Sequence, residues 1–421
     1  MIAEDRLTYP TRAGEVLQAN FHVSKGHNKA ARYRKAAKKL YVPPPNSGAV
    51  DQVRELWADG RYFQALGIHK MVSQPQAVWF NGSQSPGEVK IAVQKTVRRA
   101  RLQRAVPVLV SYNLPFRDCA QFSAGGATTV DEYQEWIDGF AAGIGKSEAI
   151  VILEPDGLGI IPHYTPITGS EPEWCQPEEA DPETAAAERF FLLNAAVDRL
   201  LEQPNVKVYL DGTHFRWLGA GDMADRLVQA GVERAAGFFL NASNYESTDV
   251  LTTYGKWVSS CIAFGTNEEE GGWRLGNFDW CGSQYYPATL DDPSTYELTD
   301  LWYEENLGTA APQTHFVVDT SRNGQGPWSE PEDHPEGDAQ TWCNPPDRGL
   351  GLPPSLSVEH ELIDAYLWIK IPGESDGECN RWADLGEPDP VRGMVNPGAG
   401  QWFDEMALEL VRFAEPSIFS Y

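Results

Sequence analysis

The sequence has little positive charge and no long apolar segment. Its 421 residues carry 34 Lys and Arg against 60 Asp and Glu, a formal net charge of −26. Nucleic acids and anionic membranes are bound mainly through Lys and Arg, so this balance argues against both as partners. The longest apolar runs, such as residues 149–153, are far shorter than the roughly 20 residues that cross a bilayer. We therefore expect no nucleic acid and no membrane partner.

Several common catalytic motifs are also missing. Gly157-Leu158-Gly159 lacks the third glycine of a dinucleotide-binding loop, because Pro162 stands in its place. The segment that begins at His360 lacks the second histidine of a zinc-protease helix, and the remaining histidines lack metal-ligand spacing. Neither a G-x-S-x-G nucleophile elbow nor a G-x-x-x-x-G-K-S/T phosphate loop is present. These absences argue against the corresponding enzyme classes, and we expect no metal site.

The cysteines form no C-x-x-C pair that would suggest zinc binding or redox catalysis. They are even in number and widely spread: Cys119, Cys175, Cys261, Cys281, Cys343 and Cys379. This pattern predicts three disulfides and therefore an oxidising compartment. Met1 is followed by no apolar signal segment. We expect a secreted protein whose signal peptide is absent from this chain.

The first residues differ in composition from the rest. Residues 1–39 carry nine Lys or Arg against three Asp or Glu, although the whole chain is strongly acidic. We interpret residues 1–38 as a basic N-terminal extension and residues 39–421 as one catalytic domain.

Short runs of β-branched and aromatic residues recur along the second part, and most precede a stretch of helical composition. They cover residues 39–42, 77–80, 106–114, 149–156, 206–212, 237–245, 314–322 and 365–377. Eight strands alternating with helices predict an α/β fold, a TIM-like parallel (β/α) barrel. Three long segments, 162–182, 248–308 and 327–354, interrupt the alternation, and we expect them to be loops around the barrel mouth.

Carboxylates follow several of these runs, where the strands of a barrel meet at one mouth. Asp156 comes directly after an apolar run, and such surroundings could raise its pKa enough for a general acid, although it could also cap the next helix. Asp118 lies beside Cys119 and is a candidate for the second carboxylate near Asp156, although it could instead form a salt bridge with Arg117. Asp376 lies in a turn, where Asp is common for conformational reasons. Paired carboxyl groups are what glycoside hydrolysis needs.

The chain is also rich in aromatic residues, with 14 Trp and 16 Tyr. Flat aromatic faces stack on the apolar faces of sugar rings, but most of these side chains are expected to be ordinary core residues.

Five segments together resemble glycoside hydrolase family 6, most closely the bacterial cellobiohydrolases. They are Tyr112-Asn-Leu-Pro-Phe-Arg-Asp-Cys119, Leu153-Glu-Pro-Asp156, Asp211-Gly-Thr-His-Phe-Arg-Trp217, Asp319-Thr-Ser-Arg-Asn-Gly324 and Trp368-Ile-Lys-Ile-Pro-Gly-Glu-Ser-Asp-Gly377. The resemblance begins near residue 39 and implies a distorted barrel that cleaves β-1,4-glucan with inversion and without a cofactor. The expected partners are cellulose and cello-oligosaccharides, and we expect a monomer.

The resemblance also implies roles for single residues. Asp156 would be the general acid, and Asp118 would raise its pKa and orient the water, with Ser123 in the same water chain. Asp376 would be the base, unless the proton passes through water to Asp118. Tyr112 would press on the sugar at the scission point.

Substrate-binding positions follow in the same way. Those on the non-reducing side would be Lys370, Glu374, Trp342 and Tyr41; those on the leaving-group side would be His214 and Trp217, and Asn244 would also bind sugar. Some family members carry a further Trp where this chain has Ala220, so a distal platform there is in doubt.

The disulfide pairs Cys119–Cys175 and Cys343–Cys379 are implied by family positions, and Cys261–Cys281 by their short spacing. Long loops that roof the cleft into a tunnel would make the protein an exo-acting cellobiohydrolase. The alternative is an endoglucanase with an open cleft. A catalytically inactive glucan-binding module should lack the carboxylates that this chain keeps.

Overall fold

The computed structural model describes residues 8–10, 16–18 and 38–421, apart from 269–271, 333 and 385. Backbone contacts divide the chain into two units, Met1–Ala37 and Lys38–Tyr421. In the first unit, β1 (Thr8–Pro10) pairs antiparallel with β2 (Val16–Gln18). Among the helices that the structure describes, none combines the length and apolar character needed to cross a membrane.

The second unit is built on a parallel sheet of seven strands. In sheet order they are β11 (Ile363–Leu367), β10 (His315–Asp319), β9 (Gly237–Leu240), β8 (Val206–Asp211), β7 (Ala149–Leu153), β6 (Val108–Ser111) and β4 (Val78–Phe80). The two edges approach one another, since the Ala77 amide donates to the Trp368 carbonyl at 2.9 Å. The predicted distorted (β/α) barrel is confirmed.

The strand count differs from the eight that the sequence predicts. The first predicted strand is only β3 (Lys39–Leu40), which pairs with β5 (Ala105–Val106) in a separate two-stranded sheet. Pro107 lies between β5 and β6 and has no N–H to donate to a ladder, which explains why the run is divided there. The predicted run 77–80 ends with β4, and the other runs extend past the ends of their strands into loops at the barrel mouth.

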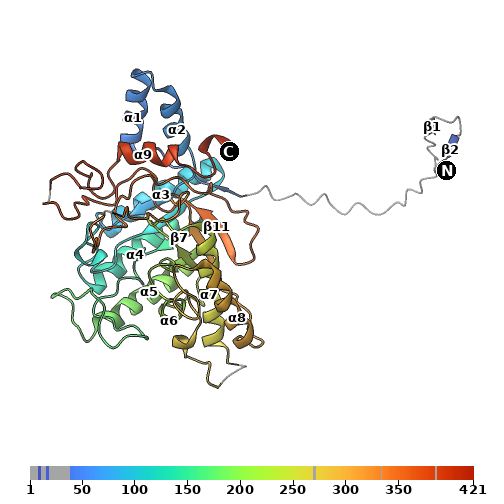
Figure 1. Ribbon diagram of the computed structural model, residues 1–421, viewed down its shortest axis with the longest axis vertical. Helices are drawn as coiled ribbons and strands as arrows, with labels where there is room; N and C mark the ends of the chain where they lie inside the picture. The colour runs from blue at the N-terminus through green and yellow to red at the C-terminus, as the bar shows by residue number, and fades with distance from the viewer. Residues whose placement is uncertain (1–7, 11–15, 19–37, 269–271, 333, 385) are drawn as a thin grey trace. The chain divides into compact units, whose positions relative to one another are not determined.

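Helices surround the strands (Figure 1). They are α1 (Ser47–Ala58), α2 (Tyr62–Val72), α3 (Pro86–Gln103), α4 (Val130–Ile144), α5 (Ala185–Leu201), α6 (Ala220–Gln229), α7 (Thr248–Thr266), α8 (Tyr296–Asn306) and α9 (Asp404–Arg412). Helix α3 shows why such elements begin where they do: Ser85 and Glu88 form a capping box, and Pro86 occupies the first turn, where no N–H is needed.

Alternation along each strand divides the core into layers. Val108, Val110 and Ile152 belong to the cluster inside the barrel, whereas Leu109 and Val151 pack in the larger cluster between strands and helices. A third cluster joins α1, α2 and α9, which lie together at one end of Figure 1. The strand ends are therefore held rigidly from both faces.

The predicted loop 248–308 is largely helical. It contains α7, the short 3-10 turns η2 (Phe278–Trp280) and η3 (Pro293–Thr295), and α8. Leu251, Tyr254, Val258 and Ile262 recur at helical spacing along α7 and are buried. Packing of this face overrides the weak helix propensity of a segment rich in β-branched and aromatic residues.

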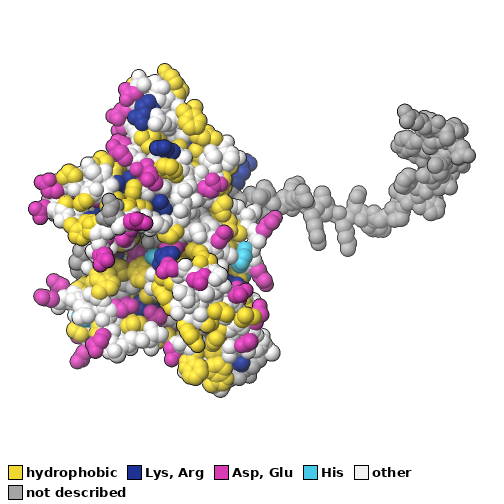
Figure 2. Space-filling view, in the orientation of Figure 1, with side chains coloured by type: hydrophobic (Ala, Val, Ile, Leu, Met, Phe, Trp, Pro, Cys, Tyr) yellow, Lys and Arg dark blue, Asp and Glu magenta, His cyan; other side chains and the backbone are white. Residues whose placement is uncertain are grey.

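The cysteines form the three predicted disulfides, Cys119–Cys175, Cys261–Cys281 and Cys343–Cys379. Acidic side chains are scattered over the face shown in Figure 2 rather than gathered in one patch. The negative charge is thus spread over this face of the molecule.

Candidate functional site

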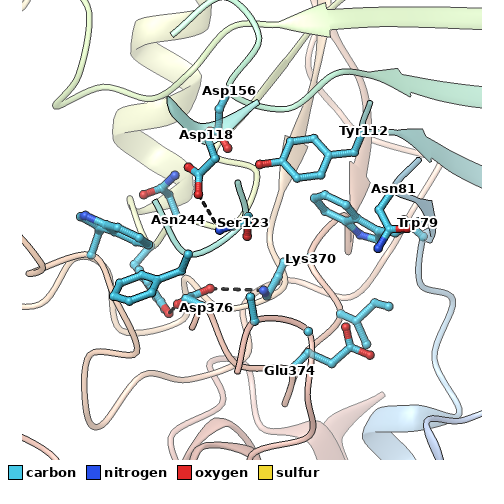
Figure 3. Close-up of a pocket in the computed structure, with 18 of the residues that line it drawn as sticks. Trp79, Asn81, Tyr112, Asp118, Ser123, Asp156, Asn244, Lys370, Glu374 and Asp376 are labelled. Carbon is cyan, nitrogen blue, oxygen red and sulfur yellow. Dashed lines mark hydrogen bonds and ion pairs between the residues drawn. The ribbon is translucent and has the colours of Figure 1, made fainter. Parts of the chain in front are cut away.

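A cavity of about 1190 Å3 opens at the carboxyl ends of the strands, and its centre is shown in Figure 3. All of the catalytic and substrate-binding candidates line it: Tyr41, Tyr112, Asp118, Ser123, Asp156, His214, Trp217, Asn244, Trp342, Lys370, Glu374 and Asp376. The structure thus brings together residues from loops that are up to 335 positions apart in the chain, from Tyr41 to Asp376.

Asp156 lies just beyond β7 with a backbone φ of 63°, in the left-handed region. It does not cap the next helix, because α5 begins only at Ala185. Burial raises its pKa well above the usual value, and the nearby carboxylates of Asp211 and Asp118 raise it further. Asp156 therefore holds its proton to a higher pH than an exposed aspartic acid does.

Asp118 begins the 3-10 turn η1 (Asp118–Ala120) after β6 and lies beside Asp156 in Figure 3. Its Oδ2 accepts from the Ser123 amide at 2.7 Å. Arg117 donates instead to the carbonyls of Asn81, Tyr112 and Ser123. Burial raises the pKa of Asp118 to about 6, against the smaller lowering effects of the Ser123 amide and the charge of Arg117.

Asp376 has a different environment. Arg322 Nη1 donates to both of its oxygens at 2.9 and 3.0 Å, and the Tyr245 hydroxyl and Asn344 amide donate to Oδ2 at 3.0 and 3.1 Å. Lys370 Nζ lies 3.3 Å from Oδ1. Burial alone would raise its pKa, but Arg322 and Lys370 outweigh burial and hold the pKa of Asp376 below its usual range. Such a carboxylate has little tendency to take up a proton.

Three other strand-end carboxylates serve the backbone. Glu154 accepts from the amides of Asn113 and Leu114, and Asp211 from those of Leu158, Gly159 and Thr213. Asp319 accepts from the amides of four residues in three segments: Ser243, Ser321, Ile369 and Lys370. These buried groups tie neighbouring loops together. The sequence pattern could not distinguish such structural carboxylates from catalytic ones.

One end of the cavity lies beside the first and last strands of the sheet. Glu374 accepts from Asn46 Nδ2 at 2.8 Å, and Tyr41 lines the same end. Trp79 also lines it, with Nε1 donating to the Ile369 carbonyl and its ring 5.4 Å from that of Tyr112. The sequence analysis missed Trp79, because an aromatic residue inside a strand looks like core.

The other end is formed by loops after β8 and β9. Burial and, to a smaller extent, the charge of Arg216 together lower the pKa of His214 to about 4, so the imidazole is neutral near pH 7. The His214 and Trp217 rings lie 5.7 Å apart. Asn244 donates to the Ala242 carbonyl at 3.0 Å and also lines the cavity. Ala220 begins α6 and is buried, so that position offers no platform.

Two loops approach one another over the cavity. Phe122 follows Asp118, and its ring lies 6.2 Å from that of Trp342. A Cβ added at Gly377 would lie 2.4 Å from the Cβ of Phe122, so the backbones are packed closely. By contrast, among the residues that the structure describes, the cavity lining includes nothing from 247–326. The expectation that 248–308 roofs the cavity is therefore wrong.

The arrangement suits acid-assisted hydrolysis. One carboxyl group, Asp156, has a strongly raised pKa and so favours its protonated form, and a second, Asp118, is ionised above about pH 6. Cleavage of a glycosidic bond needs a proton for the leaving oxygen and an acceptor for the proton of the attacking water. The elongated lining with tryptophans toward both ends fits a chain of sugar rings.

Comparison with known proteins agrees with this chemistry. The family described as "Glycosyl hydrolases family 6" matches residues 35–414. Endoglucanase A of Cellulomonas fimi is 31% identical over 89% of this chain, but the match spans only 61% of that protein's length. Endoglucanase 1 of Streptomyces halstedii is 33% identical over 88% of each chain.

A fungal relative and a solved structure extend the comparison. The 1,4-beta-D-glucan cellobiohydrolase CEL6B of Podospora anserina is 28% identical over 78% of this chain and 69% of its own. The endoglucanase Cel6 from Mycobacterium tuberculosis, solved with methyl-cellobiosyl-4-deoxy-4-thio-β-D-cellobioside, has a TM-score of 0.63 and 32% identity. That match covers 90% of this chain and 98% of the other.

Proposed function

The chain belongs to glycosyl hydrolase family 6, and we propose that it is an inverting endoglucanase that hydrolyses β-1,4-glucosidic bonds within cellulose chains. The observation that carries the chemistry is the pair of neighbouring carboxyls with different proton affinities, Asp156 and Asp118. The bacterial relatives compared above are endoglucanases, which supports the choice of substrate and of internal cleavage.

In the proposed reaction, Asp156 protonates the glycosidic oxygen as the bond to the anomeric carbon breaks. A water attacks that carbon from the opposite face, and its proton passes to Asp118, through a further water held near Ser123. Asp376 stays ionised between Arg322 and Lys370 and stabilises positive charge that develops on the sugar ring. Tyr112 packs beneath the reacting ring. The expected product is the α-anomer, because a single displacement inverts the configuration.

The sugars on either side are held by the ends of the cavity. Lys370, Glu374 and Tyr41 would bind the non-reducing side, with Trp79 as a stacking surface. Trp217, neutral His214 and Asn244 would bind the leaving-group side. Trp342 would stack on sugar from the loop above the cavity. The three disulfides support secretion into an oxidising environment.

Internal cleavage is favoured over exo action because the segment expected to close a tunnel forms α7 and α8 outside the cavity lining. One observation favours the second candidate, a cellobiohydrolase acting on non-reducing ends: Phe122 packs against Gly377 and near Trp342, and this contact could enclose the substrate.

The two candidates differ in how they cut a soluble polymer. Viscosity and reducing ends should be measured together on carboxymethyl cellulose, and early products from cellohexaose should be read with anomer resolution by NMR. An endoglucanase lowers viscosity steeply for each bond cut. Slow viscosity loss with cellobiose as the early product would select the cellobiohydrolase, and Phe122→Ala should then shift the enzyme toward internal cutting. A β-anomer as first product would rule out the inverting mechanism.

A further inference from the structure

We propose that Trp174 is a sugar-stacking platform that extends the substrate site in the cavity that His214 and Trp217 also line. The inference rests on the proposed function, because it takes the ligand of the cavity to be a β-1,4-glucan. It adds a binding contact to the residues assigned above.

Trp174 belongs to the long loop between β7 and α5, and it lines the same cavity as Arg216 and Trp217. Its side chain is 56% exposed, whereas Trp136, Trp257 and Trp368 are almost fully buried in the core. Trp174 therefore contributes a large uncovered apolar surface to a polar cavity rim.

The residues on both sides of Trp174 are fixed. The Glu173 carboxylate pairs with fully buried Arg226 at 2.5 Å, and the Glu173 amide donates to the Tyr164 carbonyl at 2.8 Å. Cys175 is buried, accepts from the His163 amide at 2.9 Å, and is bonded to Cys119, the neighbour of Asp118. The backbone at Trp174 is therefore held between an ion pair and a disulfide.

An exposed aromatic side chain on a rigid backbone loses little conformational entropy when it binds a ligand. The apolar face of a glucose ring covers the indole and removes its surface from water. Single exposed tryptophans are common on protein surfaces and need no function by themselves. The distinction here is position, because Trp174 lines the cavity together with the catalytic carboxyls.

Trp57 offers a matched control. It is 54% exposed, lies on α1, and is not among the cavity-lining residues. Each variant loses one exposed indole. A difference in ligand affinity between the two variants should therefore come only from a contact between Trp174 and the ligand.

The test measures binding by calorimetry in an Asp156→Ala background, which prevents hydrolysis, with cellotriose and cellohexaose as ligands. Trp174→Ala should raise the Kd for cellohexaose about tenfold, as for an aromatic anchor removed from an interface, and change that for cellotriose much less. Trp57→Ala should change neither, and Trp174→Phe should recover most of the affinity. In the active enzyme, Trp174→Ala should raise KM for long substrates and leave kcat unchanged.

Equal affinities of Trp174→Ala and Trp57→Ala for cellohexaose, with tight binding by the parent, would overturn the inference alone. Failure of the parent to bind or cleave any cello-oligosaccharide would overturn the proposed function, and the inference with it. The melting temperatures of Trp174→Phe and Trp174→Ala should match that of the parent. If affinity is lost only in a variant that is also destabilised, this would also count against a direct contact.

Discussion

At the scale of single residues, burial does not by itself identify the catalytic groups. Glu154 and Asp211 are buried carboxyls at strand ends and Asp156 is a partly buried one, yet only the first two accept several backbone amides. Asp156 differs because like charges surround it in an open cavity. A candidate general acid therefore differs from a structural carboxylate in the groups that contact it.

Asp156→Ala should lower kcat on unactivated glucan by about 10²–10⁴, the usual contribution of a general acid. A substrate with an activated aryl leaving group needs less protonation and should lose less. Initial rates on both substrates check this. Equal losses on both substrates in Asp156→Ala would contradict the assignment.

The pH profile should carry the signature of Asp118. Its pKa is raised to about 6, so below that pH the carboxyl is protonated and cannot accept a proton from water. Activity should therefore fall as the pH drops through about 6, whereas the same drop only favours the protonated form that Asp156 needs as an acid, since its pKa is strongly raised. Measuring kcat as a function of pH checks this acidic limb.

Asp118→Asn is neutral at every pH, so its residual activity should lack this acidic limb. An unchanged limb in Asp118→Asn would assign the ionisation to another group. Asp376 is the less suitable origin, because Arg322 and Lys370 hold its pKa below the usual range.

The sequence identified three candidate aspartates, which line one cavity, because carboxylates that follow apolar strands stand out against the pattern. It could not predict that Arg322 and Tyr245 surround Asp376, since those contacts join segments 54 and 131 residues apart. Trp79 and Trp174 were also missed. Neither a strand tryptophan nor a loop tryptophan shows from the sequence alone which way it faces.

At the scale of elements, the strands were predictable and their ends were not. Apolar runs located each strand of the main sheet, but most runs continue into a loop, which made those strands look longer. The helical spacing of α7 was present in the sequence, yet its Gly, Trp and Cys content suggested a loop. Composition was the weaker guide there, because tertiary packing decides the conformation.

Gly377 holds the two loops above the cavity together. Its φ is +153°, and an added Cβ would lie 2.4 Å from the Cβ of Phe122. Gly377→Ala should push the Phe122 loop, and Asp118 with it, away from the site, lower kcat on every substrate, and cost about 1–3 kcal/mol of stability through overpacking. Kinetics and chemical denaturation measure both effects.

Gly393→Ala is the matched control, because its φ is +68° but no atom lies within 4 Å of the added Cβ. It should cost some stability through backbone strain and leave kcat unchanged. Similar kcat values for the two variants would show that the contact with Phe122 does not position Asp118.

At the scale of the whole molecule, the second unit contains everything that the proposed reaction uses. The cavity-lining residues lie between Tyr41 and Gly400, and the three hydrophobic clusters lie between Leu40 and Tyr421. The family match begins at residue 35 and ends at 414. Catalysis and stability should therefore be properties of Lys38–Tyr421.

A protein shortened to Lys38–Tyr421 should keep the parent's melting temperature and its kcat/KM on cello-oligosaccharides. The reason is that Lys38–Tyr421 forms a compact unit of its own by backbone contacts and contains the acid, its neighbouring carboxylate and both ends of the cavity. Residues 1–37 carry seven of the chain's 34 Lys and Arg and three of its 60 Asp and Glu, so their removal makes the protein more acidic. A difference on insoluble cellulose alone would assign the basic segment a role in adsorption. A lower melting temperature or a lower kcat/KM on soluble substrate would show instead that the catalytic domain extends into residues 1–37.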